Sequence, residues 1–167
     1  RIYYLVTATN SAGSDDSPTS SAIVAGLTTL EAGGSMTLNT AYVDFLNGST
    51  GTIFEYSVPS ADTYYFYSDG TSQDADVTLY TTNSGAVADN TGYNCTVGAN
   101  DCIAKGVTTS SDQIVLTVSS GTASFPRTLY VRVWNYSTSS SVLKFGVLSS
   151  AYSGSAVNSY YSFTNNN

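Results

Sequence analysis

Histidine is absent from this chain, and charge is scarce. The sequence has no His and only 5 Lys and Arg together, 10% of its residues are charged, and its formal net charge is −7. Without an imidazole, the Ser-His-Asp and Cys-His arrangements of nucleophilic enzymes are excluded. Without clustered cations, the chain cannot displace counterions from nucleic acid. We therefore predict a non-catalytic protein that binds no nucleic acid.

Long apolar runs and nucleotide motifs are absent as well. No apolar run approaches the ~18 residues of a membrane-spanning helix, and neither G-x-G-x-x-G nor a P-loop pattern occurs, so we expect no membrane span and no required cofactor. The hydrophobic fraction is 41%, with 14 Tyr; Ser, Thr, Asn and Gly make up most of the rest. Such an uncharged, β-favouring mixture is typical of secreted and surface-exposed proteins, which predicts an extracellular or cell-surface location.

Cysteine occurs twice, at Cys95 and Cys102. A thiolate zinc site needs four ligands, and the chain offers no His and no further Cys. We therefore favour a local disulfide over two free thiols. Such a bond would stabilise the fold by roughly 2–3 kcal/mol on the chain-entropy model, and it indicates an oxidising compartment.

Short segments with alternating apolar and polar residues dominate the chain from residue 52 onward. No segment has a sustained helical period, and we expect a long loop through the cysteines to about residue 111. Gly, Ser and Asn separate the predicted strands. The pattern predicts an all-β fold, an antiparallel, jelly-roll-like β-sandwich. The clearest strands are 52–58, 64–67, 76–80, 113–118, 129–134 and 142–147.

The beginning of the chain has the features of the end of another domain. Residues 1–10 alternate as a strand, a turn follows, and residues 20–27 predict a second strand. The order Tyr4-x-Val6-x-Ala8-x-Asn10-x-x-Gly13, followed by Ser17-Pro18, resembles the last two strands of a fibronectin type III domain. The resemblance implies an N-terminal β-hairpin that is a remnant of a second sandwich.

Three regions of the chain follow from these patterns. We predict the fibronectin type III-like hairpin at 1–26 and the β-sandwich at 27–148. Residues 149–167 are rich in Ser, Tyr and Asn and carry no charge. Two alternatives stay open for this last region, a linker toward another domain or an added strand at 159–163 that pairs with a sheet edge.

Three segments of the central region share a family pattern. They are Phe54-x-Tyr56-x-Val58-Pro59, Asp74-Ala75-Asp76-Val77-Thr78-Leu79-Tyr80 and Leu129-Tyr130-Val131-Arg132-Val133-Trp134. Together they resemble the bacterial pre-peptidase C-terminal domain. The resemblance implies a jelly-roll-like β-sandwich appended to secreted peptidases and other surface proteins. Related collagen-binding modules bind calcium through an acidic linker before the first strand, where this chain offers only Glu31 and Asp44.

Acidic residues also gather around one predicted turn and the strand after it. Asp69, Asp74 and Asp76 lie there, and Asp112 is a potential partner from elsewhere in the chain. Calcium prefers six to eight oxygen ligands, so these residues are candidate ligands for Ca²⁺. Alternatively, Asp69-Gly70 is turn chemistry and Asp74 is a solvated loop residue. If Asp74 and Asp76 lie two apart on one strand, they share a face and can share a proton.

Strand 129–134 carries the candidate ligand-binding residues. Tyr130, Arg132 and Trp134 alternate with aliphatic residues and therefore lie on the opposite face of the strand. If the aliphatic face is in the core, these three form an aromatic and cationic strip that can stack on a sugar or a protein backbone. Alternatively, Trp134 is inside and the aliphatic residues pack against the second sheet, as in a central strand that is buried on both faces.

The sequence supports two functional hypotheses. The first is a non-catalytic structural or adhesive module of a secreted or cell-surface protein, a subunit of an extracellular filament that assembles by strand addition. Its partners would be other copies of the chain or neighbouring domains. The alternative is a substrate-targeting accessory domain of a secreted peptidase or other hydrolase, which binds an extracellular protein or a polysaccharide.

Overall fold

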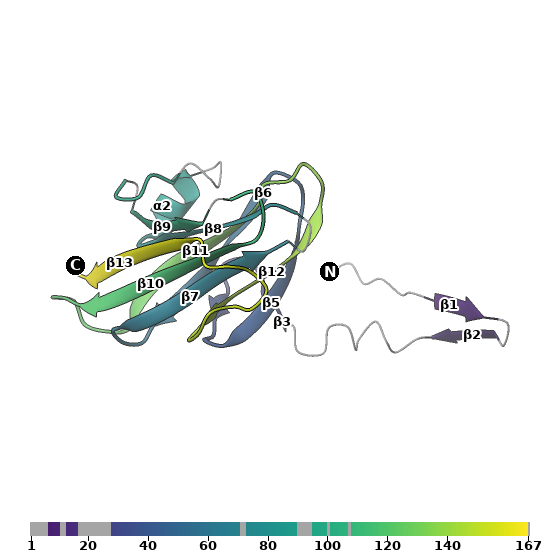
Figure 1. Ribbon diagram of the computed structural model, residues 1–167, viewed down its shortest axis with the longest axis horizontal. Coiled ribbons are helices and arrows are strands. Elements are labelled where there is room, and N and C mark those ends of the chain that lie inside the picture. The colour runs from purple at the N-terminus through teal and green to yellow at the C-terminus, as the bar shows by residue number, and fades with distance from the viewer. Residues whose placement is uncertain are drawn as a thin grey trace.

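The computed structural model describes residues 7–10, 13–16, 28–70, 73–89, 95–99, 101–106 and 108–166. Its strands from residue 28 onward form two mixed β-sheets (Figure 1). The six-stranded sheet has the order β13 (Ser159–Asn165), β10 (Asp112–Ser120), β7 (Asp62–Asp69), β12 (Ser141–Leu148), β5 (Thr40–Leu46) and β3 (Thr28–Thr29). The five-stranded sheet has the order β4 (Ser35–Met36), β6 (Thr50–Val58), β11 (Arg127–Asn135), β8 (Ala75–Tyr80) and β9 (Cys102–Gly106). The predicted all-β sandwich is confirmed.

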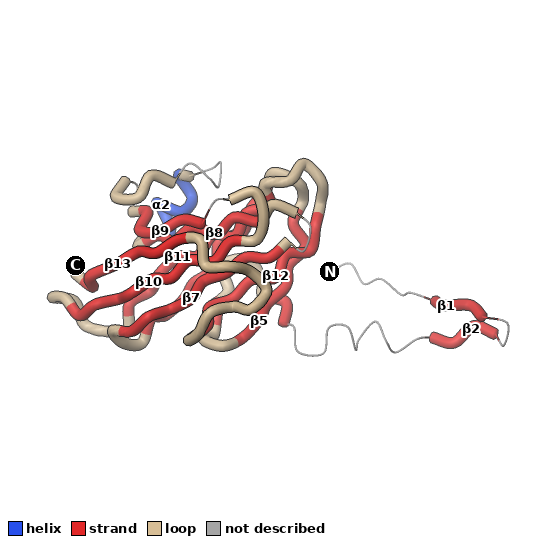
Figure 2. Tube along the Cα trace, viewed as in Figure 1, coloured by secondary structure: helices blue, strands red, loops and turns tan. Residues whose placement is uncertain are grey.

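Most neighbouring strands are antiparallel, as predicted, and the exceptions are three edge strands. β3, β4 and β13 each join their neighbour in parallel. Parallel neighbours need a crossover connection rather than a tight hairpin. These three strands are therefore additions at the sheet margins, and the fourth margin is the antiparallel strand β9. Figure 2 shows β13, β10, β7, β12 and β5 of the six-stranded sheet side by side.

The core lies between the two sheets and is rich in aromatic rings. Phe54 of β6 stacks on Phe145 of β12, with ring centroids 4.5 Å apart, and Tyr56 meets Phe66 edge to face. Each ring comes from an alternate position of its strand, because successive side chains point to opposite faces of a sheet. The alternation in the sequence therefore supplies one continuous apolar layer.

Strand β8 differs, because all of its residues are buried. Ala75, Val77 and Leu79 belong to the core between the sheets, whereas Asp76 and Tyr80 lie on the outer face of the five-stranded sheet. A strand is buried on both faces only where another layer covers its outer side. That layer comes from the segment between β8 and β10.

The same segment corrects a prediction, since it was expected to be one long loop. It contains a short helix, α2 (Asn83–Ala88), capped by the Thr82 side chain, which accepts a hydrogen bond from the Gly85 N–H. It also contains edge strand β9, paired with β8. A helix this short leaves no periodic pattern, and β9 buries small residues, Ala104 and Gly106, that give little strand signal.

The C-terminal segment crosses the outer face of the six-stranded sheet and ends in β13 (Figure 1). Tyr152 stacks on Tyr67 with ring centroids 3.9 Å apart. The close approach requires a glycine beneath it, because a Cβ on Gly146 would lie 2.9 Å from the Tyr67 ring. Of the two alternatives for residues 149–167, the structure has the strand: β13 pairs in parallel with β10 over its whole length.

At the other end, β1 (Thr7–Asn10) and β2 (Gly13–Asp16) pair antiparallel as a two-stranded sheet. The sequence predicted the returning strand at residues 20–27. In the described residues the chain returns at once, because Asn10 pairs with Gly13 across a two-residue connection. Residues 17–27, and most of the fibronectin-like pattern with them, lie outside the described residues. Within the described residues, no helix has the length and apolar character needed to cross a bilayer.

Candidate functional site

Tyr130, Arg132 and Trp134 lie on the outer face of the five-stranded sheet, opposite the aliphatic residues of β11, which are in the core. Of the two alternatives for this strand, the observed one is the central strand: β11 lies between β6 and β8 and is buried on both faces from Val131 to Asn135. Their exposure differs, since Arg132 is 7% and Trp134 is 9% exposed, while Tyr130 is only partly buried. Of these three residues, only Tyr130 is exposed enough to contact a ligand.

The Arg132 guanidinium is enclosed by the segment that covers this face. Its Nη1 donates a hydrogen bond to the Ala86 carbonyl of α2 at 2.9 Å, and its Cζ lies 4.7 Å from the centre of the Trp134 ring. Burial lowers the pKa of Arg132, and the nearby Tyr80 and Asp89 partly restore it. Arg132 therefore ties α2 to the sheet, with the cation–π contact adding to that packing.

The disulfide stabilises the same cover. Cys95 and Cys102 are bonded, as predicted, and they pack with Tyr80 and Ala86 in a second apolar cluster outside the main core. The Tyr80 hydroxyl donates to the Asp89 carboxylate. Below, we call this layer, the described residues 82–89, 95–99 and 101–102, the disulfide cover.

A hollow of about 420 Å³ lies beside the disulfide cover. Tyr130, Ile53 and Gly33 are among the residues that line it, and Glu55 and Asn83 contribute polar groups. An aromatic ring with a carboxylate and an amide close by is suited to bind a polar ligand that has an apolar face. Only Tyr130 of this set was a sequence candidate; Glu55 and Asn83 come from other elements, and nothing in the linear sequence connects them.

The candidate calcium ligands do not gather at one point. Asp69, at the end of β7, accepts hydrogen bonds from the Ser111 hydroxyl and the Tyr152 hydroxyl, each at 2.8 Å. Asp74 precedes β8, and Asp76 lies within it. Among the residues that the structure describes, no three acidic, His or Cys side chains are arranged to hold a metal ion. The calcium site stays a prediction.

Instead, Asp76 is paired with Asp112, a carboxyl from the other sheet. Asp76 is 2% and Asp112 is 0% exposed, and the two carboxyls are hydrogen-bonded to each other. The Asp112 carboxylate also accepts from the Thr108 hydroxyl and from Asn158 Nδ2, each at 2.7 Å. Because these donors favour the ionised form of Asp112, the shared proton belongs to Asp76. Burial, then the charges of Asp112 and Asp74, raise the pKa of Asp76 to about 8.

Gln113 fastens the C-terminal segment to β10. Its Nε2 donates to the carbonyls of Tyr152 and Ser155 at 3.1 and 2.7 Å, and its Oε1 accepts from the Tyr152 N–H at 2.7 Å. The fully buried amide therefore has three partners in one short segment. Below, we call residues 149–158 the polar cover. The sequence indicated no role for Gln113, since a lone amide in an alternating strand predicts a solvent-facing position.

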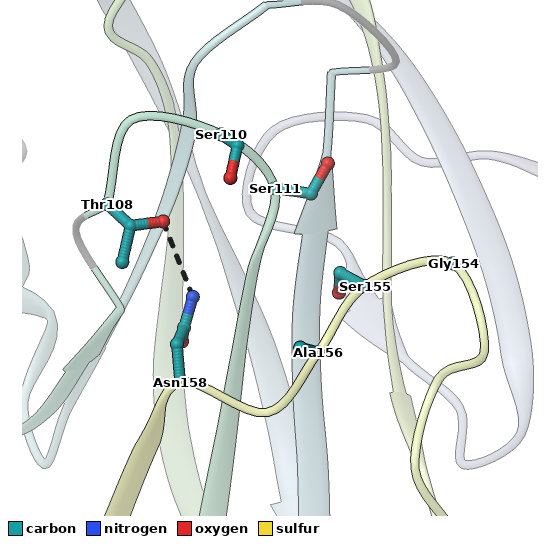
Figure 3. Close-up of a pocket in the computed structure, with 7 residues that line it drawn as sticks. All are labelled: Thr108, Ser110, Ser111, Gly154, Ser155, Ala156 and Asn158. Atoms are coloured by element: carbon teal, nitrogen blue, oxygen red, sulfur yellow. Dashed lines mark hydrogen bonds between the residues drawn. The ribbon is translucent and has the colours of Figure 1, made fainter.

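A second hollow, of about 340 Å³, lies where the polar cover meets the loop before β10 (Figure 3). The side chains of Thr108 and Asn158 face each other across it, with 3.4 Å between Oγ1 and Nδ2. Ser110, Ser111 and Ser155 contribute hydroxyls to the lining. The hollow therefore offers small hydroxyl and amide groups near the buried carboxyl pair.

Comparison with solved structures finds proteins that are similar to this chain, and two of them are described here. The structure is similar to the pre-peptidase C-terminal domain of a collagenase from Bacillus anthracis, with a TM-score of 0.46 and 15% identity over 71% of this chain and 95% of that chain. It is also similar to PliG of Aeromonas hydrophila, a periplasmic inhibitor of g-type lysozyme, with a TM-score of 0.33 and 14% identity over 72% and 96% of the two chains.

Sequence comparisons add no relative: no family model matches the chain, and no curated protein matches it. The first structural neighbour is a pre-peptidase C-terminal domain, the family that the central segments of this sequence resemble. Similarities of this size do not extend to ligands or activity.

Proposed function

We propose that this chain is a non-catalytic structural or adhesive module of a secreted or cell-surface protein, which joins other copies into an extracellular filament by β-strand addition. The observation that supports this most is β13. It is a seven-residue strand at the margin of the six-stranded sheet, and it carries no charged residue. An edge strand of this kind presents backbone hydrogen-bonding groups to any further strand.

The disulfide supports the proposed location. Cys95 and Cys102 are bonded, and disulfides persist in oxidising compartments such as the cell exterior and the periplasm. The low share of charged residues, 10%, accords with a module whose surface takes part in lateral contacts between neighbours.

Electron microscopy of the purified chain over a range of concentrations tests the filament. We expect linear assemblies that lengthen with concentration, because contacts between copies that do not close into a ring generate an open filament. Monomers or small closed oligomers at every concentration would contradict the filament. The disulfide should be kept intact in this preparation, because it holds Cys95 and Cys102 in the apolar cluster with Tyr80 and Ala86.

A separate observation favours a second candidate function, a substrate-targeting accessory module of a secreted hydrolase. The hollow beside Tyr130 combines an aromatic ring with Glu55 and Asn83, which suits a polysaccharide or an extracellular polypeptide. We expect Tyr130→Ala to abolish binding to immobilised neutral oligosaccharides or to collagen, and Tyr136→Ala, an exposed tyrosine elsewhere, to leave it unchanged. Absence of binding by the unmodified chain to both probes would rule this function out.

A further inference from the structure

The edges of the two sheets are protected unequally in the described part of the chain. β3 and β4 are two residues long, too short to template another strand. β9 has a register irregularity opposite Leu79 and Tyr80, begins at the disulfide-bonded Cys102 and carries Lys105. Short length, irregularity and lysine are the means by which edge strands avoid unwanted pairing.

β13 has none of these protections. Its sequence, Ser-Tyr-Tyr-Ser-Phe-Thr-Asn, contains no charge and no Pro. The Tyr160 ring is 73% exposed, and Tyr161 and Phe163 are only partly buried against the core. An uncharged, aromatic edge strand of this length is a site for pairing with another chain.

Both ends of β13 are fixed, so the edge is a preformed template. At its start, Asn158 donates to Asp112. At its end, the Asn165 Nδ2 donates to the Ala123 carbonyl at 3.1 Å, and the Thr122 N–H donates to Asn166 Oδ1 at 3.1 Å. A strand that is already ordered loses little conformational entropy when a partner binds.

We propose that β13 pairs antiparallel with β13 of a second copy of this chain, about a two-fold axis at Ser162, so that the two six-stranded sheets become one. This inference rests on the strand addition of the proposed function and names the partner strand. The joint is isologous, because each copy contributes the same surface. In a filament it would have to alternate with a second, different contact.

The sequence of β13 is self-complementary in this register. Ser162 lies opposite its own copy, Tyr161 lies opposite Phe163, and Tyr160 lies opposite Thr164. Residues opposite each other in an antiparallel pair share a face, so Tyr161 and Phe163 meet on the core side, where both are partly buried already. Aromatic cross-strand pairs of this kind stabilise a sheet, and here each pair occurs twice.

Charge favours a second copy at this edge and opposes it elsewhere. Each chain has a net charge of −7, so two copies repel each other over most of their surfaces. Residues 149–167 carry no charge. An approach through β13 therefore brings uncharged strands together and keeps the acidic residues of the two copies apart.

Charge substitution at the axis tests the register. We expect the unmodified chain to dimerise with rising concentration in sedimentation velocity. Ser162→Lys and Ser162→Asp alone should each raise the dissociation constant by at least about tenfold, because like charges then face each other. An equal mixture of the two variants should dimerise again. Ser153→Lys, in the exposed polar cover, is the matched control and should dimerise like the unmodified chain.

Cross-linking gives a second, independent measurement. Under mild oxidation, Ser162→Cys should form a covalent dimer, because the two thiols face each other at the axis. Ser159→Cys should not, since its opposite residue is Asn165. Three results would each overturn the proposal. They are a chain that is monomeric at all concentrations, dimers whose dissociation constant is the same in both charge variants as in the unmodified chain, and equal cross-linking at the two positions.

The outcome is separable from that of the proposed filament. Dimers that respond to Ser162→Lys without filaments in electron microscopy support the joint and contradict the filament. Filaments that persist with Ser162→Lys support the filament and overturn this joint.

Discussion

The two sheets cover their outer faces by different means. The five-stranded sheet has the disulfide cover, where Tyr80, Ala86 and the cystine form an apolar cluster and hydrogen bonds from Arg132 and Tyr80 add to it. The six-stranded sheet has the polar cover, held by the buried Gln113 amide and by a tyrosine hydroxyl on Asp69. The stability of apolar packing does not depend on pH, and such packing tolerates small displacements of its side chains. A polar cover depends on every hydrogen bond, since an unpaired buried group is costly.

The largest effect is expected where one residue holds a whole cover. Gln113→Ala removes three hydrogen bonds and leaves backbone groups of Tyr152 and Ser155 without their partners, so the free energy of unfolding should fall by about 3 kcal/mol. Denaturant titration measures the loss. Thr117→Ala, at an exposed position of the same strand, is the control. A loss of similar size in both variants would show that the Gln113 hydrogen bonds do not hold the polar cover in place.

Removal of the disulfide should have the next largest effect. Cys95→Ser with Cys102→Ser is expected to cost about 2–3 kcal/mol, mainly by releasing the constraint on the unfolded chain. Hydrogen exchange should accelerate in the disulfide cover, while core strands such as β12 stay protected. A reducing agent should produce the same loss of stability in the unmodified chain. It should not change the stability of the double variant. Loss of protection throughout the sandwich would mean that the two sheets depend on this cover.

Between the two covers, the Asp76–Asp112 pair links the outer face of one sheet to the polar cover of the other. The pKa of Asp76, raised by burial to about 8, means that the folded protein binds a proton which the unfolded chain releases near pH 4. Stability should therefore fall as pH rises from about 4 to about 8 and then level off. Asp76→Asn keeps a donor toward Asp112 without the charge and should flatten this dependence, with a gain of about 2 kcal/mol at pH 8.

The control is Asp62→Asn, at an exposed position, which should keep the dependence on pH. The same titration in EDTA and in millimolar calcium tests the calcium prediction, because a cation bound by Asp74 and Asp76 would replace the proton and stabilise the protein at high pH. A flat profile for the unmodified chain in EDTA would contradict the shared proton.

The fold class could be predicted from the sequence because alternation is a local signal. Strand β11 shows both the reach and the limit of that signal. The period of two placed Tyr130, Arg132 and Trp134 together on one face of the strand, but it left open which face lies in the core. Its exposure could not be assigned, because helix α2, which binds the Arg132 guanidinium, comes from residues 83–88, and no local pattern in β11 carries information about that helix.

The candidate site shows the same limit more strongly. Asp76 was a candidate, yet its partner Asp112 comes from the other sheet and meets it only because β8 and β10 begin side by side, at Ala75 and Ser111. Gln113 gave no signal at all, because an amide is buried only when three specific partners surround it. Contacts of this kind depend on tertiary structure and are not encoded in any one segment.

The smallest expected effect isolates one hydrogen bond of the polar cover. Tyr152→Phe keeps the ring that stacks on Tyr67 and removes only the hydroxyl that donates to Asp69. Because the site is partly exposed, the loss should be about 1 kcal/mol. Tyr152→Ala removes the ring as well and should cost more, with faster hydrogen exchange in β13. If the two variants were equally destabilised, the hydroxyl would hold the polar cover and the stacked ring would add nothing. If Tyr152→Phe were neutral, stacking alone would hold it, and the two covers would resemble each other more than their hydrogen bonds indicate.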